Sequence, residues 1–126
     1  MKIIEDLKDT GARTLAHFQL PEDQLNKSYA PEKWTVRELL HHLADAETVL
    51  YDRIRRSISK PGQVVWAFDQ DAWCTGLNYK EMPLALNRQV YSAVRTSIIH
   101  LAEQFYVSKG DNQYVHSETG LRTVKD

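Results

Sequence analysis

The sequence predicts an all-α protein, an up-down helical bundle around one core. Three segments carry apolar residues at the three- and four-residue spacing of an amphipathic helix, and proline or glycine ends each of them. No segment shows the strong alternation that is typical of a β-strand. Because three apolar stripes need a shared partner, and an up-down bundle usually buries four, we expect a four-helix bundle whose last helix lies beyond residue 126.

The first predicted helix ends before Pro21, and a loop follows it. Its inward positions recur at helical spacing and are Ile4, Leu7, Gly11, Leu15 and Phe18. The stretch 20–34 holds two prolines and mixed polar residues, so we expect a loop with a short helical turn at 22–26.

The second helix has the clearest start. Thr35 stands as an N-cap with Glu38 three residues later, the arrangement of a capping box. From there the helix can run to about Ser59, where Lys60, Pro61 and Gly62 stop it.

Residues 61–82 have little periodicity, and within them only 69–73 could form a short helix. Pro83 suits the first turn of a third long helix, which runs to about Val107. Its apolar stripe consists of Leu84, Val90, Tyr91, Val94, Ile98, Leu101 and Phe105. Residues 110–112 break it, and the polar stretch 114–126 is predicted to be a loop.

Composition narrows the class of protein. Of the 126 residues, 42% are hydrophobic and 26% charged, which is typical of a single globular domain spanning 1–126. The formal net charge of −1 lacks the basic excess of nucleic-acid-binding proteins, so we expect no nucleic-acid partner. The single cysteine, the absence of a signal-peptide core and the lack of an apolar run of about 20 residues favour a cytoplasmic protein without a membrane partner.

The informative segment is Trp-Thr-Val-Arg-Glu-Leu-Leu-His-His-Leu-Ala-Asp-Ala-Glu, residues 34–47. At about 100° per residue, the apolar side chains of this helix define one arc, made of Val36, Leu39, Leu40, Leu43, Leu50 and Ile54. His41 falls nearly opposite that arc and should meet solvent, whereas His42 falls on its flank and can reach a partly enclosed cavity. Glu47 projects toward the apolar side, so it is either a functional group or reaches solvent through a bend.

This segment resembles the first-helix signature of the DinB-like superfamily, in the branch of metal-dependent hydrolases and bacillithiol transferases. The stretch Phe-Asp-Gln-Asp-Ala-Trp at 68–73 resembles that branch's loop motif. The stretch Tyr-Val-His-Ser-Glu at 114–118, followed by Gly120, resembles the segment before its last helix. The resemblance implies a four-helix bundle, commonly a homodimer, that holds a divalent metal such as zinc or nickel with three histidines.

In that pattern the first metal ligand is the histidine before Leu-Ala-Asp, which is His42 here. The other two ligands come from a His-x-x-x-His pair on the last helix, and this sequence has no such pair. His17 and His100 lie off their apolar stripes and are expected at the surface, and His116 matches a loop. Since a catalytic site needs about three protein ligands, we expect an incomplete metal site that binds metal weakly or not at all in this chain.

Other residues could shape a pocket. Trp66, Phe68 and Trp73 cluster in the 61–82 loop, where they could wall a ligand site or plug the bundle end. Asp69 and its neighbour Asp71 could orient a metal ligand, act as a base or be solvated caps, and the last is the usual role of loop carboxylates. A cysteine beside a tryptophan, as at position 74, is more often a packing residue than a reactive thiol.

Two functions follow from these features. The first is a metal-dependent hydrolase or thiol S-transferase acting on a small-molecule substrate, with its metal site incomplete in this chain. The second is a catalytically silent bundle that acts through dimerisation or partner binding, because an apolar stripe lacks a partner.

Overall fold

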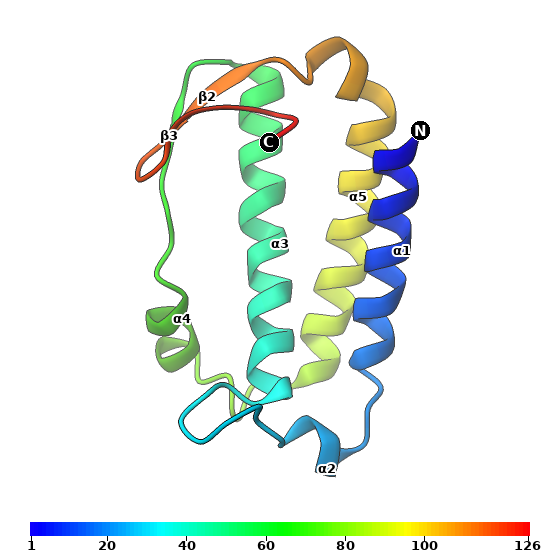
Figure 1. Cartoon of the computed structure of the whole chain (residues 1–126), viewed down its shortest axis with the longest axis vertical. Coiled ribbons are helices and arrows are strands. Elements are labelled where there is room, and N and C mark those ends of the chain that lie inside the picture. Colours follow the sequence, from blue (N-terminus) through cyan, green and yellow to red (C-terminus); the bar gives the residue numbers. More distant parts are fainter.

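The structure, a computed structural model, describes residues 1–126. Three long helices lie side by side: α1 (Lys2–His17), α3 (Val36–Ser59) and α5 (Leu84–Lys109). Helix α5 packs against both α1 and α3 (Figure 1). The all-α bundle is as predicted, but α3 and α5 run in the same direction, because the connection between them returns along the length of the bundle (Figure 1).

Helix boundaries follow the signals in the sequence. Thr35 Oγ1 accepts a hydrogen bond from the Glu38 amide at 3.2 Å, and the Glu38 carboxylate accepts one from the Thr35 amide at 3.1 Å, so the predicted capping box forms. The two short helices, α2 (Glu22–Leu25) and α4 (Gln70–Gly76), lie where short turns were predicted.

The core lies where α3 and α5 meet the end of α1 and helix α2. Its buried members are Phe18, Leu25, Leu40, Ala44 and Tyr91. The predicted apolar arc of α3 is buried only in part, since Leu39 and Leu50 are 46% and 40% exposed. Leu50 lines an apolar groove with residues of α1 and α5, which include Leu7 and Leu101.

A small sheet, which the sequence analysis missed, joins the two segments predicted as loops. Its strands are β1 (Val64–Val65), β2 (Gln113–His116) and β3 (Gly120–Thr123) in that order. Strand β1 pairs with β2 in parallel, and β2 with β3 antiparallel. Strands of two to four residues are too short to show alternation, and the pairing of β1 with β2 joins residues about 50 positions apart, such as Val64 and Val115.

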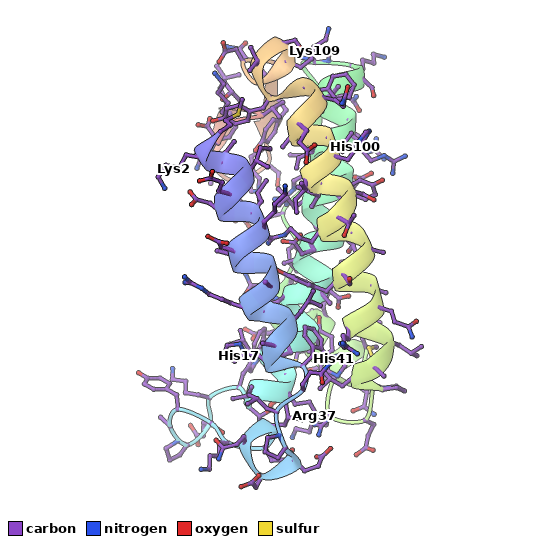
Figure 2. All side chains as sticks on the ribbon, turned by 90° about the vertical axis from the view of Figure 1, so that its right-hand side faces the viewer. Lys2, His17, Arg37, His41, His100 and Lys109 are labelled. Atoms are coloured by element: carbon purple, nitrogen blue, oxygen red, sulfur yellow. The ribbon has the colours of Figure 1, made fainter.

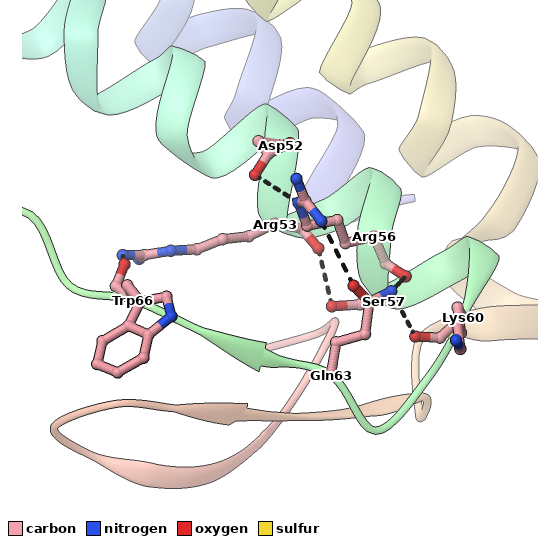
Figure 3. Close-up of polar contacts among 7 residues, drawn as sticks. All are labelled: Asp52, Arg53, Arg56, Ser57, Lys60, Gln63 and Trp66. Atoms are coloured by element: carbon pink, nitrogen blue, oxygen red, sulfur yellow. Dashed lines mark hydrogen bonds and ion pairs between the residues drawn. The ribbon is translucent and has the colours of Figure 1, made fainter.

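The segment after α3 is fastened to that helix by the arginines of its last turns. Arg53 Nη2 donates to the Trp66 carbonyl at 2.8 Å, and Gln63 Nε2 donates to the Lys60 carbonyl at 2.9 Å (Figure 3). Arg56 pairs with Asp52 at 2.8 Å. Arg53 and Arg56 are thus engaged within the chain, and the bond from Arg53 holds the residue after β1 beside α3.

No helix of the chain combines the length and the apolar character needed to cross a membrane.

Candidate functional site

The predicted ligand His42 lies among aromatic side chains near the start of α3. Its ring packs edge-on against Trp34, with centroids 5.2 Å apart, and stacks on Phe68 at 6.0 Å. Trp73 of α4 supports Phe68 at 4.7 Å. The connection between α3 and α5 runs alongside α3 (Figure 1), and its side chains Phe68 and Trp73 pack toward His42 on that helix.

The environment of His42 suits a neutral imidazole. Burial lowers its pKa below the ordinary 6.5, and the negative charge of Asp45 opposes this shift in part. Its Nδ1 atom is buried and has no hydrogen-bond partner. The neutral ring is the form that ligates a divalent metal, so the chemistry of this side chain fits the role of one ligand.

The other predicted pocket residues divide into those at His42 and those elsewhere. Phe68 and Trp73 are brought to His42, whereas Trp66 is 77% exposed and makes no aromatic pair. Asp69 caps α4, accepting a hydrogen bond from the Ala72 amide at 3.0 Å. This is the capping alternative that the sequence left open.

Glu47 does not face the aromatic residues. It is buried between α3 and α5 and forms an ion pair with Arg95, with Nη2–Oε1 at 2.7 Å and Nε–Oε2 at 2.9 Å. From the sequence, Glu47 was expected to be either a functional group or exposed to solvent. In the structure it is neither, because its charge is paired with Arg95 in the interface between the helices.

The prediction that His41 meets solvent was wrong, because its side chain is fully buried at 0% exposure. Its ring stacks on Tyr79, with centroids 5.3 Å apart and planes inclined by 28°. Asn87 Nδ2 donates to its Nδ1 at 2.7 Å. The helical wheel considered only the long helices, and the segment after α4 covers this outer face of α3.

A polar cleft beside Trp34 was not predicted. It has a volume of about 340 Å³ between the start of α3 and α4, and is lined by Trp34, Glu38, Asp71, Cys74, Thr75, Asn78 and Lys80. Cys74 Sγ donates to the Glu38 carboxylate at 3.2 Å. Burial, followed by this contact with Glu38, raises the pKa of the Cys74 thiol to about 11, so it stays protonated at neutral pH and is a poor nucleophile.

The remaining histidines do not join His42. His17 and His100 are exposed on α1 and α5 (Figure 2), as predicted. His116 Nδ1 accepts hydrogen bonds from the amides of Glu118 and Thr119 in the β2–β3 turn. Across the 126 residues, no three His, Cys, Asp or Glu side chains converge to hold a metal ion. The residues of this chain therefore do not by themselves fit a three-ligand site.

Comparison with known proteins finds relatives among bacterial proteins. Two from Oceanobacillus iheyensis, each named "putative metal-dependent hydrolase", are 26% identical over 105 residues and 27% identical over 121 residues. These alignments cover 83% and 96% of this chain. The chain spans 60% of the length of the first relative and 69% of the second.

A solved structure shows the same fold. Bacillus subtilis YfiT, described as "a probable metal-dependent hydrolase with an unusual four-helix bundle topology", superposes with a TM-score of 0.86 at 22% identity. The match covers 98% of this chain and 72% of that one. The profile of the DinB superfamily matches residues 6–126, nearly the whole sequence. This chain, with its long helices and its His-His-Leu-Ala-Asp segment on α3, belongs to the DinB superfamily.

Proposed function

We propose that this protein takes part in metal-dependent hydrolysis or thiol S-transfer, and that His42 is the metal ligand that it contributes from α3. The observation that carries the proposal is the state of His42: a neutral imidazole with one buried, unpartnered nitrogen, packed between Trp34 and Phe68. The names of the relatives support metal-dependent hydrolysis, and S-transfer is an expectation from the family resemblance.

The ligand count sets a condition on this proposal. A catalytic zinc or nickel site needs about three protein ligands and an open position. With one imidazole available here, the further ligands would have to come from another molecule or segment, for example from a second copy of the chain. The small-molecule substrate would then occupy the cleft of about 340 Å³ beside Trp34, where Lys80 and Asp71 supply opposite charges.

Binding of Zn²⁺ to matched histidine variants tests the proposal. The proposal expects equilibrium dialysis to detect at least weak Zn²⁺ binding by the unaltered chain, and His42→Ala should abolish it; no binding by the unaltered chain would count against the proposal. His100→Ala removes an imidazole that is exposed on α5, and should leave binding unchanged. Equal losses in both variants, or no loss in His42→Ala, would sink the assignment of His42.

A second candidate function rests on a different observation. A groove of about 190 Å³ runs between α1, α3 and α5, and most of its lining side chains are apolar. They include Leu7, Leu50, Ile54, Ile98, Leu101 and Phe105. An apolar groove of this kind supports the alternative that the chain is a catalytically silent bundle acting through a homodimer or another partner.

Sedimentation measurements distinguish this alternative. If the groove forms a dimer interface, the unaltered chain should sediment as a dimer, and Leu50→Gln should weaken the association by placing an amide in that interface. Leu86→Gln is the matched control, because Leu86 is exposed on α5 and does not line the groove. A monomer at all concentrations would count against self-association.

A further inference from the structure

His41, the neighbour of the proposed ligand, is the centre of a buried polar cluster to which the proposed function gives no role. Tyr79 stacks on its ring and donates its hydroxyl to Asp45, one turn further along α3. Asn87 in the first turns of α5 donates to His41 Nδ1 at 2.7 Å and contacts Met82 Sδ at 3.2 Å. The cluster thus joins α3, the segment after α4, and the start of α5.

The contacts continue from this cluster back to α3. The Tyr79 amide donates to the Cys74 carbonyl at 3.1 Å, which fixes the end of α4 relative to Tyr79. Trp73 in that helix packs on Phe68 at 4.7 Å, and Phe68 stacks on His42 at 6.0 Å. The path leaves α3 at one histidine and returns to it at the next, so it forms a closed ring of contacts.

Directional contacts fix the orientation of the His41 ring. Because an amide N–H can only donate, Nδ1 accepts from Asn87 and the ring proton lies on Nε2. The Met82 backbone acts on the same ring and raises the pKa of His41, in opposition to the larger effect of burial, which lowers it. Directional hydrogen bonds of this kind select one orientation of the segments that they join.

We propose that His41 and Tyr79 are positioning residues for His42. They lock the segment after α4 against α3, and that segment holds Phe68 and Trp73 against the imidazole that faces the site. The two adjacent histidines would then have different roles: His41 fixes the segment that carries Phe68 and Trp73, and His42 faces the metal. The metal role of His42 in this inference rests on the proposed function, whereas the fixing of its ring does not.

The test is the position of the His42 ring-proton resonances in NMR spectra of the metal-free chain. Stacking on Phe68 and Trp34 should displace these resonances from those of the exposed His17 and His100, because aromatic rings shift nearby protons. Tyr79→Leu removes both the stack on His41 and the hydroxyl. The displacement should then be largely lost, with the His42 resonances approaching the exposed positions.

Tyr91→Leu is the matched control. Tyr91 is 2% exposed, as Tyr79 is 1% exposed, but it packs on Phe18 in the core. Its replacement should lower the melting temperature and leave the His42 resonances in place. The proposal would be overturned if the two substitutions moved the His42 resonances by the same amount, or if a folded Tyr79→Leu left them unchanged.

If Tyr79→Leu does not fold, Tyr79→Phe supplies the same comparison, because it removes only the hydroxyl that binds Asp45. The His42 resonances should then move toward the exposed positions by a smaller amount than expected for Tyr79→Leu. Unchanged His42 resonances in that variant would then overturn the proposal.

Addition of Ni²⁺ separates this inference from the proposed function. A His42 signal that responds to Tyr79→Leu but not to Ni²⁺ would remove the metal role and keep the positioning role.

Discussion

Arg95 holds Glu47 through two hydrogen bonds in the interface between α3 and α5, at 2.7 and 2.9 Å. The same guanidinium donates to the Leu7 carbonyl at 2.9 Å and to Thr10 Oγ1 at 2.8 Å, both on α1. One cation therefore links all three long helices.

Glu47→Ala should be strongly destabilising, because it leaves the largely buried Arg95 without its counter-charge. Loss of one partner of a buried pair costs about 3–5 kcal/mol. The double variant Glu47→Leu with Arg95→Met removes both charges and should recover most of that loss. Urea denaturation measures the free energy of unfolding, and a single variant no less stable than the double variant would contradict this account.

The capping box predicts a pH-dependent contribution from Glu38. Although burial opposes it, hydrogen bonds from Thr35 and Cys74 hold the pKa of Glu38 below the ordinary 4.5. A lowered pKa in the folded state means that this stabilisation is present above pH 4.5 and is lost as the pH falls through the folded value. Thr35→Ala should cost about 1 kcal/mol at pH 7.

Measurement of the free energy of unfolding at pH 7 and pH 3 checks the sign. Glu38→Gln should be less stable than the unaltered chain at pH 7, and the difference should be smaller at pH 3, because the unfolded chain is protonated there and the stabilisation is lost as the pH falls through the folded pKa. Glu5→Gln, an exposed carboxylate in the first turn of α1, should show a smaller change. A constant difference for Glu38→Gln would contradict the pH argument.

Cys74 should react slowly with alkylating reagents in the folded protein. Burial and the contact with Glu38 raise its pKa from 9.0 to about 11. This increase in pKa lowers the fraction of thiolate at pH 8 about 100-fold. Labelling by iodoacetamide should therefore be slow at pH 8, and should accelerate as the pH approaches 11. The control is the urea-unfolded chain, and equal rates in both states at pH 8 would exclude the raised pKa.

Local signals predicted the helices and part of the site. The capping box, the prolines and the apolar spacing placed the helices correctly, and the helical wheel put His42 at the edge of the apolar arc, where the structure has it beside Phe68. These features depend on residues within a few positions of one another, so a single sequence reveals them.

The errors concern contacts between distant segments. Tyr79 covers His41 from 38 positions away, and the ladder pairing Val64 with Val115 spans 51 positions. Glu47 is neutralised by Arg95, which lies on another helix. The periodicity of the sequence does not reveal such contacts, so His41 was predicted to be exposed and β1 to be a loop. Strands β2 and β3 pair locally, but four residues each are too few to show the alternation of a strand.

The most direct test of the central claim is a Ni²⁺ titration of the unaltered chain, followed by NMR of its five histidine rings. Paramagnetic Ni²⁺ broadens the signals of the ring that it binds. If His42 is the ligand that α3 contributes, its ring signals should broaden first, before those of His17 and His100. Broadening that begins at the exposed histidines and leaves His42 unchanged would contradict the account.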